Sequence, residues 1–120
     1  MGDESNAGYL QVDSIPDGCC VTVRLSGEVD IASVDQIRTA TRNARDQHDA
    51  SHLIVDCQGL DFLDSSGVKA FLEAHDAFAG KVVLVRPRRV VSRVFEVTGL
   101  DELFAVADSV DRAQEAVHAM

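Results

Sequence analysis

The chain has 120 residues, 46% of them hydrophobic, which is enough apolar surface for one domain with a single core. Its formal net charge of −9, from 20 acidic and 11 basic residues, is repelled by nucleic-acid phosphates, so we expect no direct nucleic-acid partner. No apolar run approaches the ~20 residues that span a bilayer, and no apolar signal core starts the chain. We therefore expect a cytoplasmic protein that makes no membrane contact.

The amino-terminal part of the chain predicts a tail followed by a hairpin. Residues 1–8 are polar and small, so we expect a flexible tail there and a single domain over residues 9–120. Apolar and polar side chains alternate over residues 9–15 and 19–26, as they do in half-buried strands. The Pro-Asp-Gly of residues 16–18 supplies a turn between them, which indicates an antiparallel hairpin.

The hydrophobic period changes after Gly27-Glu28-Val29-Asp30. Apolar residues then recur at helical spacing, and Ser33 with Gln36 has the pattern of a capping box. A helix is therefore predicted from about residue 34 to about residue 48.

The rest of the chain alternates strand and helix patterns. Continuous aliphatic runs at residues 53–55 and 82–85 are typical of parallel strands. The other expected elements are a helix over residues 68–78 closed by Gly80, a helix from residue 90 to Gly99, a strand at residues 104–107 and a terminal helix capped by Ser109. This order predicts an α/β fold, a small mixed sheet in which an antiparallel hairpin precedes parallel strands with crossover helices.

Three loops of this fold are expected to carry function. Residues 27–33, 58–66 and 86–89 follow strands, and in such sheets the working loops lie beyond the carboxyl ends of the parallel strands. The middle loop contains Asp64-Ser65-Ser66-Gly67, which places hydroxyl groups at a helix amino terminus, where anions are favoured. A phosphorylated serine would suit that position. The same spacing is also expected when Asp64, Ser65 or Ser66 only caps the helix. On spacing alone we favour the cap.

Three ordered motifs resemble those of a known family. Gly27-Glu28-Val29-Asp30 is similar to a G-E-hydrophobic-D motif, Asp64-Ser65-Ser66-Gly67 to a D-S-S/T-G phosphorylation loop, and Thr98-Gly99-Leu100 to a T/S-G-L helix end. Together, from about residue 12 to residue 116, they resemble the STAS domain in its anti-sigma factor antagonist branch. Val68-Lys69 stands where that branch most often has Leu-Gly, a departure that puts a cation in the first helical turn.

The resemblance implies a switch. The unmodified protein would bind an anti-sigma factor that is a serine kinase and so release a sigma factor, and phosphorylation of Ser65, with Ser66 as second choice, would end that binding. A phosphatase is a further expected partner. The expected partner-binding residues are Asp30, Asp64, Ser66 and Gly67, and we expect the Asp30 carboxylate to have little structural duty. No catalytic residue is implied.

Three other groups of residues give weaker signals. Cys19, Cys20 and Cys57 form neither a disulfide framework nor a spaced metal motif, so we interpret them as small core residues and expect no metal or cofactor. The histidines lack a ligand cluster. The arginines beside Pro87 are able to bind a phosphate or an acidic surface, but a solvated loop is the interpretation we favour for Arg86, Arg88 and Arg89.

Three alternative functions have some support in the sequence. A serine-nucleophile enzyme lacks a G-x-S-x-G elbow and an obvious base, since His75 lies far along the same predicted helix as Ser65. A receiver-like phosphoaspartate domain would use Asp56 at the end of a parallel strand, but no lysine follows the later strands. A STAS module that works as a scaffold in another signalling complex also fits the sequence.

Overall fold

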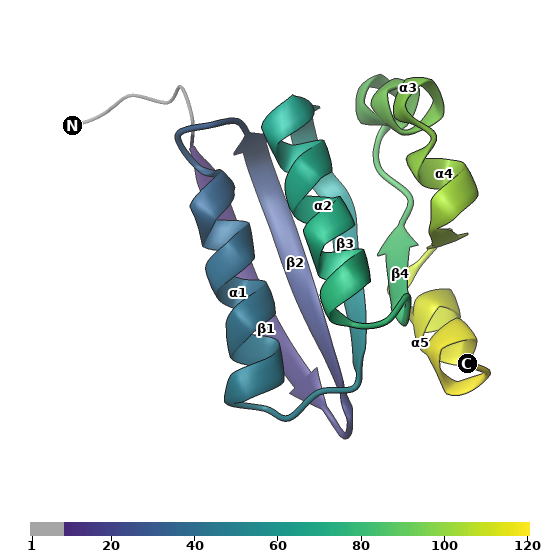
Figure 1. The fold of residues 1–120 in the computed structure, drawn as a ribbon. Coiled ribbons are helices and arrows are strands. Elements are labelled where there is room, and N and C mark those ends of the chain that lie inside the picture. Colours follow the sequence, from purple (N-terminus) through teal and green to yellow (C-terminus); the bar gives the residue numbers. More distant parts are fainter. Residues whose placement is uncertain (1–8) are drawn as a thin grey trace.

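The computed structural model describes residues 9–120, and their five strands form one sheet in the order β1-β2-β3-β4-β5. β1 (Leu10–Asp17) pairs antiparallel with β2 (Cys20–Val29), and all later pairings are parallel. The other strands are β3 (His52–Leu63), β4 (Val82–Val85) and β5 (Ala105–Ala107). The expected mixed sheet is therefore confirmed (Figure 1). The predicted tail, residues 1–8, lies outside the described residues.

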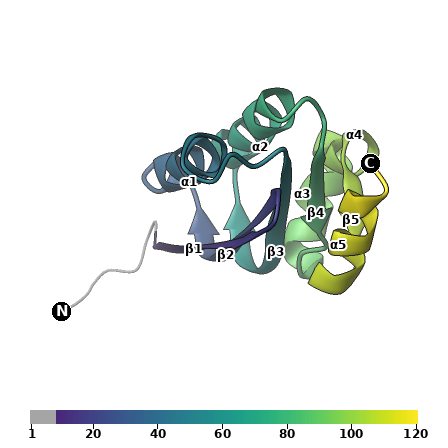
Figure 2. The same ribbon diagram turned by 90° about the horizontal axis from the view of Figure 1, so that it is seen from below.

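The helices cover the two faces of the sheet unequally. They are α1 (Val34–Asp46), α2 (Ser65–Ala77), α3 (Arg89–Thr98), α4 (Leu100–Leu103) and α5 (Val110–His118). α1 and α2 lie on one face, whereas α5 lies on the other, beside β3 and β4 (Figure 2). Alternate residues of β2 explain this arrangement, since Val21, Val23 and Leu25 are buried in the main core under α1 and α2. A smaller cluster on the α5 face contains Cys20, Ile54, Val83, Val85, Ala113 and Val117.

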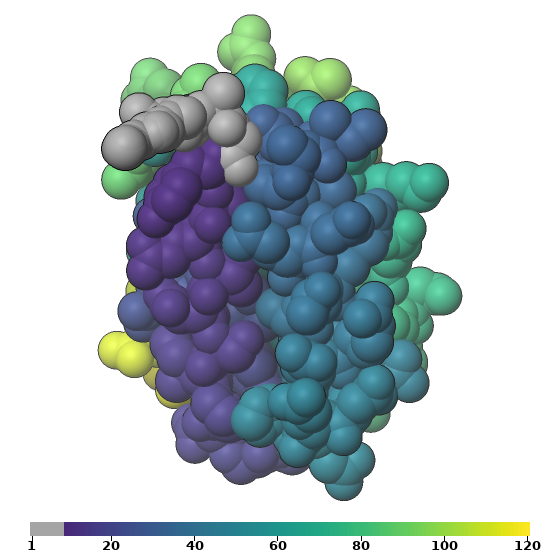
Figure 3. Space-filling model, turned by 90° about the vertical axis from the view of Figure 1, so that its left-hand side faces the viewer, coloured from purple at the N-terminus to yellow at the C-terminus, as the bar shows by residue number. Residues whose placement is uncertain are grey.

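The hairpin turn lies later than the sequence predicts. Asp17 pairs with Cys20, so the turn consists of Gly18 and Cys19, and Gly18 has a φ of 63°. Pro16 lies within β1 rather than in the turn, opposite Val21. β1 is an edge strand, where a residue without an N–H is tolerated because one side of the ladder is open. Figure 3 shows β1 running beside α1 along this side of the molecule.

Strands β2 and β3 are longer than expected. Of the predicted loops 27–33 and 58–66, the parts before Asp30 and before Asp64 belong to strands, and Val29 pairs with Leu63. The register between the two strands shifts twice on the way. At Gly59 a Cβ atom would lie 2.9 Å from the carbonyl oxygen of Leu25, so only glycine allows this close approach. The extension carries both motifs to the end of the sheet.

The helix ends follow the sequence with small differences. Gly80 and Gly99 have φ values of 80° and 79° just after α2 and α3, which confirms them as helix ends. Ser109 accepts a hydrogen bond from the backbone N–H of Arg112, so it caps α5 as expected. α1 ends at Asp46, two residues short of the prediction. The one-turn helix α4 was not expected. In the described part of the chain no helix is long and apolar enough to cross a membrane.

The three cysteines occupy different environments. Cys20 and Cys57 are buried, as expected of small core residues, but Cys19 is exposed because it lies in the hairpin turn, so the interpretation of Cys19 as a core residue is wrong. Burial raises the pKa of the Cys20 thiol to about 11. Burial, with the neighbouring Asp56 carboxylate as a smaller cause, also raises the pKa of Cys57 well above its usual range.

Thiol labelling tests this arrangement. In the folded protein at mildly alkaline pH, a water-soluble thiol reagent should modify Cys19 quickly and leave Cys20 and Cys57 almost unmodified, because the reactive species is the thiolate. In denaturant all three should react at similar rates. Rapid modification of Cys57 without denaturant would contradict the burial of β3.

Candidate functional site

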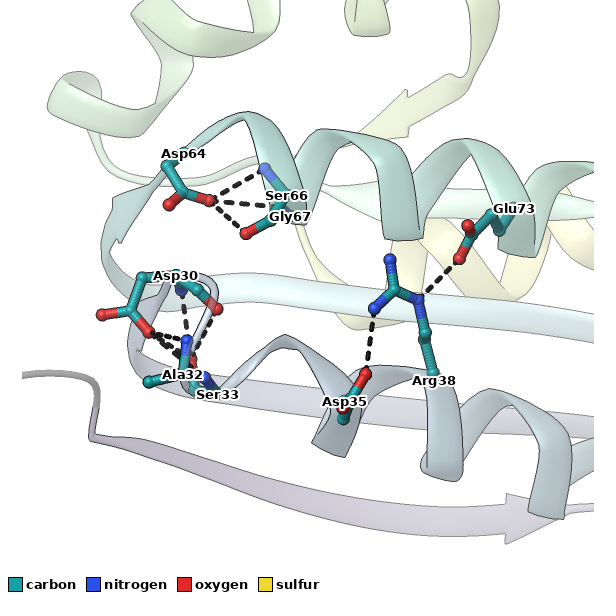
Figure 4. A network of polar contacts seen from close by, with 9 residues as sticks. All are labelled: Asp30, Ala32, Ser33, Asp35, Arg38, Asp64, Ser66, Gly67 and Glu73. Carbon is teal, nitrogen blue, oxygen red and sulfur yellow. Dashed lines mark hydrogen bonds and ion pairs between the residues drawn. The ribbon is translucent and has the colours of Figure 1, made fainter.

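Two short loops meet at the end of the sheet where β2 and β3 stop. One loop, residues 30–33, joins β2 to α1, and the other is Asp64 alone, between β3 and α2. The backbone N–H of Asp64 donates to the carbonyl oxygen of Val29, 3.2 Å away, so the second loop is anchored to the end of the neighbouring strand. Figure 4 shows the Asp30 and Asp64 side chains at this same edge. The structure therefore brings together the two motifs that lie far apart in the sequence.

Asp64 is the N-cap of α2. Its backbone is extended, with φ −106° and ψ −171°, and its Oδ1 atom accepts from the backbone N–H groups of Ser66 (3.0 Å) and Gly67 (3.3 Å). The same oxygen accepts the hydroxyl of Ser66 at 2.6 Å. The favoured capping interpretation is thus correct for Asp64. One carboxylate oxygen therefore fixes the start of the helix and also accepts the hydrogen bond of the Ser66 hydroxyl.

Ser65 differs from Ser66 in every respect that bears on modification. It is the first residue of α2 and is exposed, whereas Ser66 is only partly exposed. The structure shows no hydrogen bond from the Ser65 hydroxyl to any residue in the range 9–120. A hydroxyl in this state is accessible and has no partner to lose.

Gly67 allows α2 to pack directly on the strand ends. A Cβ atom at this position would lie 2.3 Å from Leu63 Cδ1 and 2.6 Å from Val29 Cγ1, and both of those side chains are buried. Gly67 itself is buried. This gives Gly67 a packing function, while the expected direct contact with a partner stays a prediction.

Asp30 shapes the first loop. Its Oδ1 atom accepts from the backbone N–H groups of Ala32 (3.0 Å) and Ser33 (3.2 Å) and lies 3.2 Å from the Ser33 hydroxyl oxygen. The expectation that this carboxylate has little structural duty is therefore wrong. The reason is that the chain reverses direction within this loop, which leaves backbone N–H groups that need acceptors.

Ser33 is buried and does not form the predicted capping box. Its backbone is near-helical, with φ −114° and ψ −14°, and its side chain makes no cap hydrogen bond to the N–H groups of α1. Its hydroxyl instead accepts from the N–H of Asp30 (3.1 Å) and lies 3.0 Å from the carbonyl oxygen of Glu28. The Ser33 side chain thus closes the loop backwards onto β2. The capping-box interpretation is wrong because this longer-range arrangement uses the same hydroxyl.

An ion pair joins the two helices that follow these loops. The Arg38 guanidinium of α1 donates to Glu73 of α2 at 2.8 Å and to Asp35 at 2.9 Å (Figure 4). The hydrogen bond to Glu73, followed by that to Asp35, raises the pKa of Arg38. Both carboxylates are exposed and Arg38 is only partly buried, so these ion pairs contribute little to stability.

The arginines after β4 mostly have carboxylate partners. Arg86 pairs with Asp108 at 2.8 Å, and Arg88 pairs with Asp61 of β3. Arg89 starts α3 and is exposed. Because Asp61 lies close to the end of β3, the Arg88 pair links the third loop to the edge that holds Ser65.

The residues required by the alternative chemistries lie apart. Asp56 does not end a strand, because β3 continues to Leu63, and its carboxylate is buried with its Oδ1 accepting from the N–H of Gln58. His75 packs its ring against Phe104 with centroids 4.8 Å apart, near the far end of α2 from Ser65. Over residues 9–120 no three His, Cys, Asp or Glu side chains gather in a way that could hold a metal ion.

One exposed residue of this edge, Ile31, is not identified as a functional candidate by the sequence motifs. Ile31 follows Asp30 directly, and 83% of its surface is exposed. The sequence gives no pattern that marks Ile31, because Val29, Ala32 and Val34 around it are apolar as well.

Replacement of Gly67 by alanine tests the packing of α2. We expect Gly67→Ala to lower the free energy of unfolding by about 1–3 kcal/mol, because the added methyl group must displace Leu63 or Val29. Urea denaturation measures the difference, and Lys69→Ala, an exposed position on the same helix, is the matched control. A Gly67→Ala protein as stable as the control would show that the helix start yields easily.

Two substitutions of Asp30 separate its hydrogen bonds from its charge. Asp30→Ala should destabilise the protein by about 1–3 kcal/mol, because donors of a partly buried loop lose their acceptor. Asp30→Asn keeps an oxygen in the same place and should cost less than about 1 kcal/mol. Chemical denaturation of both variants compares these values. Equal stabilities of the alanine variant and the wild type would refute the structural function of the carboxylate.

Comparison with known proteins agrees with this geometry. The family model described as STAS domain matches residues 9–113. An anti-sigma F factor antagonist of Lysinibacillus sphaericus is 37% identical over 83 residues, which cover 67% of this chain and 71% of that protein.

Two solved structures are similar over most of their length. The phosphorylated form of the Bacillus cell fate determinant SpoIIAA is 29% identical with a TM-score of 0.65, covering 90% of this chain and 99% of that one. An anti-sigma factor antagonist from Mycobacterium paratuberculosis has a TM-score of 0.82 over 92% of this chain and 96% of that one, at 22% identity, which shows the shared fold. The chain belongs to the STAS domain family, in the branch of the anti-sigma factor antagonists.

Proposed function

We propose that this protein is an anti-sigma factor antagonist whose unphosphorylated form binds a serine-kinase anti-sigma factor and so releases a sigma factor. Phosphorylation of Ser65 by that kinase ends the binding, and a phosphatase restores it. The observation that carries the proposal is the Ser65 hydroxyl, which is exposed at the edge where both motifs meet and has no hydrogen bond to the described residues. The family of the chain and the name of its relative from Lysinibacillus sphaericus support the antagonist activity.

The choice of Ser65 over Ser66 rests on the cap of α2. Phosphorylation of Ser66 would replace a hydroxyl that donates to Asp64 at 2.6 Å by a group with no proton to donate and with added negative charge. That change would repel the capping carboxylate and disturb the helix start. Phosphorylation of Ser65 breaks no hydrogen bond of the described chain.

The fold is suited to accept a phosphate at Ser65. The group would lie at the positive end of the α2 dipole, and no acidic residue occupies the first turn of that helix. The phosphate adds about −1.5 to −2 charges. Because the edge already carries Asp30 and Asp64, a partner that fits the neutral hydroxyl meets a strongly negative surface after modification.

The protein acts in this proposal as a binding partner and kinase substrate, not as a catalyst. Its residues supply the hydroxyl and hold it in place, while ATP and the transferring groups belong to the kinase. We place this exchange in the cytoplasm, where ATP is available to that kinase.

Phosphorylation assays with the purified protein test the assignment. The protein is incubated with ATP and each serine-kinase anti-sigma factor encoded in the same genome, and mass spectrometry locates the phosphate. We expect Ser65→Ala to bind the kinase but to incorporate no phosphate, with a free energy of unfolding within about 0.5 kcal/mol of wild type, because the hydroxyl is exposed and makes no hydrogen bond within residues 9–120. Phosphorylated wild type should bind roughly 5- to 150-fold more weakly than the free form.

Other outcomes decide against parts of the proposal. Phosphate on Ser66 in the wild type would show that the loop is right and the residue wrong. No binding and no labelling by any of these kinases would refute the antagonist switch and favour a scaffold in another signalling complex.

A further inference from the structure

Ile31 is the most exposed large apolar side chain in the described part of the chain, with 83% of its surface accessible. It lies in the loop of residues 30–33, at the edge of the sheet that also holds Asp64 and Ser65. Single exposed apolar residues are common on protein surfaces. Ile31 differs from these because it lies in a hydrogen-bonded loop at the edge of the sheet where α2 and Ser65 begin.

Hydrogen bonds fix the loop on both sides of Ile31. Asp30 Oδ1 accepts from the N–H groups of the two residues that follow Ile31, and the hydroxyl of the buried Ser33 ties the loop back to β2. The branched side chain of isoleucine has few rotamers. The backbone that carries Ile31 is thus fixed before any partner arrives, which reduces the entropy lost on binding.

The surroundings of Ile31 are acidic. Asp30 uses Oδ1 for the loop and Asp64 uses Oδ1 for the helix cap, while neither Oδ2 atom accepts a hydrogen bond from a residue in the range 9–120. These two oxygens remain available to donors of a partner. The whole chain carries a net charge of −9, so a basic partner surface is the complement of this edge.

We propose that Ile31 is the apolar anchor of the surface that the serine-kinase anti-sigma factor binds, and that it enters an apolar pocket of that partner rimmed by lysine or arginine side chains. This inference rests on the function proposed above and adds the residue that supplies the binding energy. An aliphatic side chain that becomes fully buried in a pocket, with polar contacts around it, has the character of an interface hot spot.

Binding of the kinase to two isoleucine variants tests the anchor. The probe is the kinase that phosphorylates Ser65 in the assay above, loaded with a non-hydrolysable ATP analogue so that no phosphate is transferred. We expect Ile31→Ala to raise the Kd about 10- to 30-fold, in line with hot-spot truncations. The matched control is Ile15→Ala, which changes another partly exposed isoleucine at the opposite, hairpin end of β1 and should keep the Kd within about twofold of wild type.

Two further measurements exclude indirect effects and test the basic rim. Thermal melting should give the same Tm for Ile31→Ala as for wild type, because the removed atoms are solvent-exposed. The Kd of wild type should rise with salt, since ion pairs are screened, while the ratio between Ile31→Ala and wild type should stay constant.

Each contrary result has a distinct meaning. A Kd of Ile31→Ala within twofold of wild type, or an equal loss for Ile15→Ala, would overturn the anchor while Ser65 phosphorylation of the wild type still supports the proposed function. A wild-type Kd that does not change with salt would overturn the basic rim. If the wild type binds none of the serine-kinase anti-sigma factors, the anchor and the proposed function both fail.

Discussion

The pairing of β2 with β3 up to their last residues is the constraint on which the functional edge depends. Val29 lies opposite Leu63, and the carbonyl of Val29 accepts the N–H of Asp64, so the chain must leave both strands at the same level. Had β3 stopped at its aliphatic run, the serine loop would begin near the middle of the sheet. The two register shifts, with Gly59 allowing close approach, let both strands continue to the common end.

Each motif at this edge combines a structural carboxylate with an exposed neighbour. Asp64 caps α2 and is followed by the exposed Ser65, and Asp30 closes its loop and is followed by the exposed Ile31. The carboxylates satisfy backbone N–H groups that would otherwise lack acceptors where strands turn into helices. In both loops the hydrogen bonds of the carboxylate fix the backbone beside an exposed side chain.

The sequence predicts the fold better than it predicts the details of the site. Alternation and aliphatic runs locate every strand, because burial on one or both faces leaves a direct pattern. The far ends of β2 and β3 carry no such pattern, since Gly27, Gly59 and Asp61 interrupt it and pairing with a distant strand decides the outcome. Likewise the residues of a capping box are present at Ser33 and Gln36, yet the buried serine bonds back to β2, a contact that spacing cannot reveal.

The proposed switch needs no conformational change in the domain that carries it. Within residues 9–120 the Ser65 hydroxyl makes no hydrogen bond that phosphorylation would break, and the start of α2 favours added negative charge, so the free and phosphorylated forms would differ mainly in surface charge. The partner, in contrast, would have to bring its basic and apolar groups against a phosphate beside Asp30 and Ile31. Phosphorylation would therefore change the free energy of partner binding more than the free energy of unfolding of the domain. Because the Ser66 hydroxyl donates to Asp64 while Ser65 is exposed, the geometry supports the proposed modification at Ser65 rather than at Ser66.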